Sequence, residues 1–123
     1  MAAAREVLVT LDGHLTREVL AARLAAAFTA IVASPEPPAV LVDCRGMSGY
    51  DIDARSEFVD WNRKVKDRIV AVAVLTENRL WHVVVASMGL ASGQTMKAFL
   101  DDRSARAWVT EVVMPRAAAR STR

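Results

Sequence analysis

Hydrophobic and polar positions follow two alternating periods along this chain. Short apolar runs rich in β-branched residues occupy residues 6–11, 39–43 and 69–75, and a shorter one occupies 96–100. Each run is predicted to be a β-strand. The segments between the runs repeat apolar residues every three to four positions, which is typical of amphipathic helices. The run at 69–75 is apolar throughout, as expected for a strand covered on both faces.

The first two helices have recognisable starting residues. Thr16 is a candidate N-cap for a helix whose apolar spacing continues to Ile31 and which the prolines after Ser34 end. Asp51 or Asp53 can cap the second helix. Its expected inward face consists of Ala54, Phe58, Trp61 and Val65.

The third helix is ambiguous by composition. The three valines at 83–85 favour a strand, but the apolar spacing and length of residues 80–90 favour a helix, which Gly93 is expected to end. A fourth helix is predicted to begin at Asp102 and to stop at Pro115. Residues 116–123 are then expected to form a basic, disordered tail.

Four strand–helix units imply a mostly parallel sheet with right-handed crossovers. We therefore predict one domain over residues 1–115, a small α/β sandwich of four to five strands flanked by about four helices. Loops able to bind a ligand should follow the carboxyl ends of the strands, at residues 12–15, 44–50 and 76–79.

The formal net charge of +2 comes from the end of the chain. Arg116, Arg120 and Arg123 have no acid among them, and taking these three from the 16 basic residues leaves 13 against 14 acidic ones. Such a balance argues against nucleic acid as the main partner. No apolar run is long enough to span a bilayer, no signal peptide is evident, and one cysteine allows no internal disulfide. We therefore expect a cytoplasmic protein without a membrane span.

The segment from Ala39 to Asp51 carries most of the candidate chemistry. Its apolar run ends in an acid, and two glycines then precede a helical pattern. A strand that leads into a helix N-terminus is where open α/β domains place ligands, because the first amides of the helix lack partners within it. We predict a loop that binds a partner or ligand, formed by Asp43, Cys44, Gly46, Ser48, Gly49 and Tyr50.

Two side chains of this predicted loop have alternative roles. Ser48 could carry a phosphate near the helix N-terminus, or it could satisfy loop backbone groups. Cys44 could be a nucleophile, or it could be a small buried apolar group. A nucleophilic cysteine needs a base, and His14 is better placed for this than His82. These cysteine and histidine residues are too scattered to predict a metal site.

Trp61 and Trp81 are the aromatic residues of most interest. Both belong to a set of aromatic and thioether side chains at helical spacings, which core packing would explain. Each also has a polar neighbour, Asn62 or His82. The two tryptophans are therefore candidates for an exposed interface or for the wall of an apolar pocket.

Several segments together resemble one family. Residues 9–16 resemble the strand, glycine, Leu-Thr and helix opening of STAS domains, and residues 39–43 resemble the second strand of that family. Residues 80–94, 96–99 and 105–109 are similar to the SpoIIAA-like branch, which is related to anti-sigma-factor antagonists. The resemblance extends over about residues 6–113 and depends on the order and spacing of the motifs.

The resemblance implies a small α/β sandwich with a mixed sheet, no enzymatic activity, no cofactor and regulation through protein partners. Partners of this family include regulatory kinases and anti-sigma factors. In the antagonists a serine within Asp-Ser-x-Gly is phosphorylated, and the corresponding residue here is Ser48, although no acid precedes it. The branch is also grouped with Sec14/CRAL-TRIO lipid-binding domains, so a small apolar ligand is the alternative. The high apolar content is compatible with a homodimer.

Overall fold

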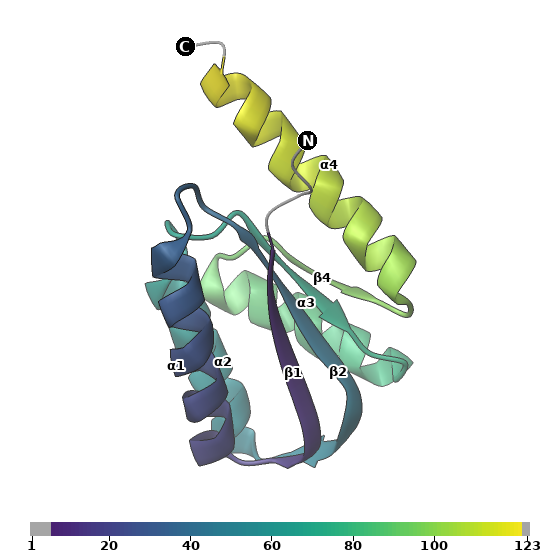
Figure 1. Cartoon of the computed structure of the whole chain (residues 1–123). Helices are drawn as coiled ribbons and strands as arrows, with labels where there is room; N and C mark the ends of the chain where they lie inside the picture. Colours follow the sequence, from purple (N-terminus) through teal and green to yellow (C-terminus); the bar gives the residue numbers. More distant parts are fainter. Residues whose placement is uncertain (1–5, 122–123) are drawn as a thin grey trace.

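The computed structural model describes the backbone of residues 6–121 and the side chains of residues 6–112. Strand and helix alternate throughout the described chain (Figure 1). The elements in order are β1 (Glu6–Leu15), α1 (Arg17–Ala33), β2 (Ala39–Tyr50), α2 (Ile52–Lys64), β3 (Ala71–Leu75), α3 (Arg79–Ser92), β4 (Met96–Phe99) and α4 (Asp102–Ser121).

The four described strands form one sheet in the order β1-β2-β3-β4, and every neighbouring pair is parallel. Because each crossover moves one strand in the same direction and has the same hand, α1, α2 and α3 cover one face. The chain then turns back, and α4 covers the other face (Figure 1). The predicted α/β sandwich is confirmed, and the sheet is wholly parallel over the described residues rather than mixed.

Alternate residues of β2 and β3 pack into two separate apolar layers. Val40, Val42 and Val72 face the first three helices, whereas Leu41 and Ala73 face α4. This explains why the third apolar run lacks alternation, since β3 is buried on both sides. Ala105 and Val109 of α4 are fully buried against the small residues of the second layer.

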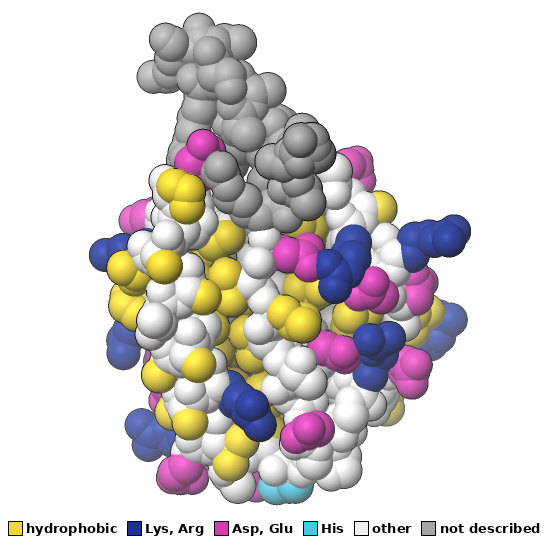
Figure 2. All heavy atoms as spheres, viewed as in Figure 1, with side chains coloured by type: hydrophobic (Ala, Val, Ile, Leu, Met, Phe, Trp, Pro, Cys, Tyr) yellow, Lys and Arg dark blue, Asp and Glu magenta, His cyan; other side chains and the backbone are white. Residues whose placement is uncertain are grey.

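The side of the sheet near β1 is less completely covered. On the face seen in Figure 2, apolar side chains gather over α1 and beside β1. Among the large apolar residues of these two elements, Leu8, Val19, Phe28 and Val32 are exposed. Some of the large apolar side chains therefore lie on the surface and not in the core.

The helix starts follow the sequence closely. The Thr16 hydroxyl accepts a hydrogen bond from the amide of Val19 at 3.2 Å, and the Asn78 side chain accepts one from the amide of Leu80 at 3.0 Å. Gly93 ends α3 in the left-handed conformation, with φ of 73°. The predicted third helix is confirmed, because its apolar spacing outweighs the strand preference of its valines.

Two predicted loops are wrong. Residues 12–15 continue β1, and residues 44–50 continue β2, because these two strands stay paired to their ends. The twelve residues of β2 face only ten of β1, and two register shifts accommodate the difference. One shift places Cys44 and Arg45 opposite Leu11, and the other leaves Ser48 as the extra residue. Glycines that suggested a loop therefore belong to a bulged strand.

The end of the fourth helix also differs from the prediction. Helix α4 does not stop at Pro115 but runs to Ser121. A proline inside a helix removes one backbone hydrogen bond, and the helix can continue with a local distortion. Of the predicted tail at 116–123, residues 122–123 lie outside the described part of the chain.

Candidate functional site

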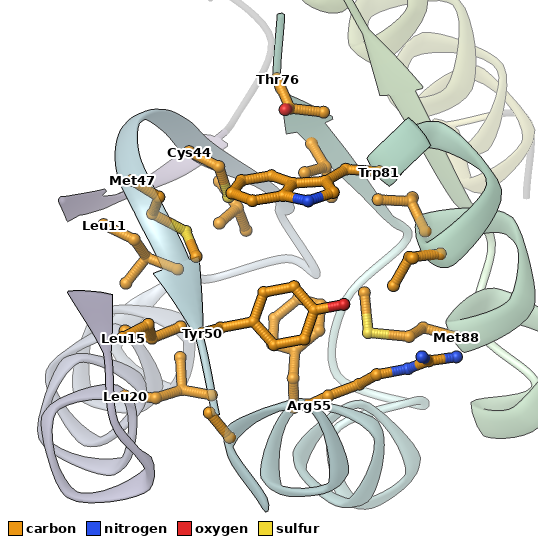
Figure 3. Close-up of a pocket in the computed structure, with 16 residues that line it drawn as sticks. Leu11, Leu15, Leu20, Cys44, Met47, Tyr50, Arg55, Thr76, Trp81 and Met88 are labelled. Carbon is orange, nitrogen blue, oxygen red and sulfur yellow. The ribbon is translucent and has the colours of Figure 1, made fainter. Parts of the chain in front are cut away.

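A small apolar pocket lies between the sheet and helices α2 and α3 (Figure 3). Its volume is about 70 Å³, and it sits near the carboxyl ends of β1, β2 and β3. Its lining comes from β1, β2 and β3, from Thr76 just after β3, and from helices α1, α2 and α3. The lining residues are Leu11, Leu15, Leu20, Val42, Cys44, Met47, Tyr50, Ala54, Arg55, Phe58, Val74, Thr76, Trp81, Val84, Val85 and Met88.

The two bulges of β2 determine which of its side chains reach the pocket. In a regular strand, residues two apart share a face, so Val42 and Cys44 would be followed by Gly46 and Ser48. Each extra residue shifts this alternation by one position. The residues that line the pocket are therefore Val42, Cys44, Met47 and Tyr50, while Gly46 and Ser48 are exposed.

Two aromatic rings stand on opposite walls of the pocket. Tyr50 at the end of β2 and Trp81 in the first turn of α3 have ring centroids 5.8 Å apart with an interplanar angle of 70°. This edge-to-face arrangement is favourable for aromatic pairs. It joins the end of the bulged strand to α3 and closes part of the pocket (Figure 3).

Arg55 forms the polar border of the pocket. Its Nη2 atom donates a hydrogen bond to the Ser87 hydroxyl at 2.9 Å and so links α2 to α3. The same arginine lines an outer groove of about 380 Å³ between the two helices. The Arg55–Ser87 bond therefore lies where the inner pocket and the outer groove meet.

Cys44 is part of the apolar wall. Burial, helped by the nearby Asp43 carboxylate, raises the pKa of the Cys44 thiol to about 12. His14 Nε2 contacts Asp51 Oδ1 at 2.7 Å, and His82 Nε2 contacts the Thr76 carbonyl oxygen at 3.0 Å. The cysteine–histidine pairing considered from the sequence is thus absent among the described side chains, and the thiol is protonated at neutral pH.

We expect the Cys44 thiol to react slowly with Ellman's reagent in the native protein at pH 8 and rapidly after unfolding. The thiolate is the reactive form, and a pKa of about 12 leaves very little of it. Because the folded-state pKa is raised, the folded protein should also lose stability as the pH rises from about 9 towards 12. Cys44→Ala should remove that part of the pH dependence, and equal labelling of native and unfolded protein would contradict a buried thiol.

The remaining residues of the predicted loop point elsewhere. Asp43 accepts hydrogen bonds from Arg45 Nε at 3.0 Å and Nη2 at 2.9 Å, and these bonds lower the pKa of its carboxyl group. At Gly46, a Cβ atom would lie 3.1 Å from Cβ of Asp12, so a larger residue would require Asp12 to shift by a few tenths of an ångström. Gly49 lies beside His14.

Trp61 is not a surface residue. Only 8% of it is exposed, and its ring stacks on Phe58 with centroids 6.4 Å apart. The interface role considered for it is therefore wrong, because the inward face of α2 includes Trp61. Of the predicted site residues, the pocket brings together Cys44, Tyr50 and Trp81.

Met47 and Arg55 line the pocket, although neither is among the site residues predicted from the sequence. Met47 reaches the pocket only because of a bulge that no local pattern shows. Arg55 lies in the first turn of α2 and belongs to no recognisable motif. The apolar spacing of α2 does place Arg55 beside Ala54, at the edge of the face that packs inward, and this position could have indicated a residue that borders a pocket.

A family model described as SpoIIAA-like matches residues 7–110. The chain belongs to the SpoIIAA-like family. SpoIIAA-like domains are STAS-type domains that are generally non-enzymatic and generally interact with proteins. The assignment agrees with the resemblance predicted from the motifs.

A solved structure supports the SpoIIAA-like fold. An uncharacterized protein of the DUF3478 family from Shewanella loihica PV-4, with a SpoIIAA-like fold, superposes with a TM-score of 0.67. The match covers 83% of this chain and 82% of that one, at 19% identity, so it concerns the fold alone. A comparison with curated proteins finds no match.

No described helix is both long and apolar enough to cross a membrane. Within the same residues, no group of three histidine, cysteine, aspartate or glutamate side chains could hold a metal ion.

Proposed function

We propose that this SpoIIAA-like domain is a non-enzymatic binding domain that takes up a small apolar group in the pocket between β2, α2 and α3. The observation that carries this proposal is the pocket itself, which lies at the carboxyl ends of parallel strands, where α/β domains place ligands. A cytoplasmic location is part of the same proposal.

The size and lining of the pocket indicate the kind of group it would hold. An apolar cavity of roughly 150 Å³ can hold benzene, so 70 Å³ suits a short chain or the end of a longer one. The thiol in the wall is protonated, and it has no base among the described side chains. These features support binding rather than nucleophilic chemistry.

We expect native mass spectrometry of freshly purified protein to show a species heavier than the chain by one small organic adduct. The reason is that an apolar pocket would retain a molecule with a small apolar group during a gentle preparation. Denaturing the same sample should return the mass of the bare chain. A bare mass in every non-denaturing preparation would contradict retention of such a ligand.

A second function, partner docking, is supported by the outer face of α3. Leu80, Val83 and Leu90 are 78%, 70% and 87% exposed, and their spacing places them on one face of the helix. Large exposed apolar side chains in one stripe favour a protein interface. The partner would be a regulatory kinase, an anti-sigma factor or a second copy of the chain. Sedimentation that shows a monomer at high micromolar concentration would contradict docking of a second copy.

Phosphorylation of Ser48 belongs to the partner-docking proposal. Ser48 is an exposed, extra residue of β2, four positions before α2 begins at Ile52. Its exposure would give a kinase access to the hydroxyl. The helix N-terminus expected to favour the phosphate begins at Ile52, directly after Asp51, which is one of the two N-cap residues predicted from the sequence.

A further inference from the structure

Arg55 has a positive charge but no carboxylate partner among the described side chains, which points to an anionic ligand. Among the described arginines, four contact carboxylates, namely Arg17, Arg45, Arg63 and Arg106, and the others without such a contact, Arg23, Arg68, Arg79 and Arg103, are exposed, whereas Arg55 is half-buried. Among the described side chains, the only recorded partner of Arg55 is the neutral Ser87 hydroxyl. A guanidinium carries five donors, so most of its hydrogen-bonding capacity remains for another group.

The position of Arg55 makes this unbalanced charge informative. The side chain is half-buried and borders both the apolar pocket and the outer groove. Figure 3 shows the Arg55 guanidinium and the Tyr50 hydroxyl both directed towards Met88. Partial removal of water strengthens the attraction of such a cation for an anion. Asp60 also lines the groove, but it is paired with Arg63 at 3.2 Å, which offsets its charge.

We infer that the ligand of the pocket is an amphipathic carboxylate. Its short apolar chain would occupy the pocket, and its carboxylate would accept hydrogen bonds from the Arg55 guanidinium. The planar fork of arginine matches the two oxygens of a carboxylate. The Ser87 hydroxyl, which accepts from Arg55, still has its own hydrogen to donate to the same anion. This inference rests on the proposed binding function of the pocket.

The test compares two ligands with the same chain by isothermal titration calorimetry at pH 7. Hexanoate should bind the wild-type protein at least about tenfold more tightly than 1-hexanol, because hydrogen bonds to a charged group are stronger than neutral ones. Arg55→Gln should remove this preference, so that hexanoate and 1-hexanol bind with similar affinities. Arg63→Gln is the matched control, since Arg63 lies on the same helix and already has a carboxylate partner.

The possible outcomes separate the carboxylate inference from the binding proposal. Equal binding of hexanoate and 1-hexanol by the wild type would overturn the inference and leave the apolar pocket in place. Binding of neither compound would overturn both. Acetate binding as tightly as hexanoate would also overturn the inference, because the chain would then contribute nothing. The wild-type comparison does not require the Arg55→Gln variant to fold.

Discussion

Replacing Trp61 by alanine is expected to lower the free energy of unfolding by about 3–5 kcal/mol. The side chain is almost completely buried and stacks on Phe58, so its removal leaves a large cavity between α2 and the sheet. Small domains are stabilised by roughly 5–15 kcal/mol in total. The variant should therefore lie close to the limit of folding at 37 °C.

Urea unfolding followed by circular dichroism measures this difference. Leu90→Ala is the control, because Leu90 is 87% exposed and its loss should change stability by no more than about 0.5 kcal/mol. If Trp61→Ala changed stability as little as Leu90→Ala does, Trp61 would not belong to the core. The alternative considered from the sequence, an exposed interface residue, would then regain support.

The order of the elements could be predicted from the sequence because the apolar periods are local. Residues 80–92 illustrate this well. A strand would place Val83 and Val85 on the same face, whereas the helix buries Val85 and exposes Val83. The apolar spacing over three turns decided the question, and single-residue propensities did not.

The site was less predictable because its decisive feature is a pairing between distant segments. The bulges of β2 exist only in relation to β1, which is about thirty residues earlier in the chain. Without them, Gly46 and Ser48 would be assigned to the pocket, and Met47 would be left out. Glycines at 46 and 49 indicated an irregular backbone correctly, but they could not distinguish a bulged strand from a loop.

Arg55 is a second site residue whose role could not be predicted from the sequence. A single arginine on a helix normally indicates a solvated face. Its significance comes from what surrounds it, namely an apolar pocket, a groove and a neutral hydroxyl from another helix. None of these three neighbours is visible in the local pattern around residue 55.

Replacing Val84 by phenylalanine is expected to weaken binding of 1-hexanol at least about tenfold, because the larger ring would occupy the pocket. Val83→Phe adds the same atoms at the adjacent position, where the side chain is 70% exposed. That variant should bind 1-hexanol as the wild type does. Thermal unfolding of both variants would show that each one is folded.

The most direct measurement is a titration of ¹⁵N-labelled wild type, Val84→Phe and Val83→Phe with 1-hexanol, followed by amide chemical shifts. Binding in the pocket should produce saturable shifts at Tyr50 and Trp81 in the wild type and in Val83→Phe, with much weaker binding in Val84→Phe. Shifts confined to Leu80 and Leu90, or the loss of binding in Val83→Phe alone, would place the apolar site on the outer face of α3 and contradict the pocket.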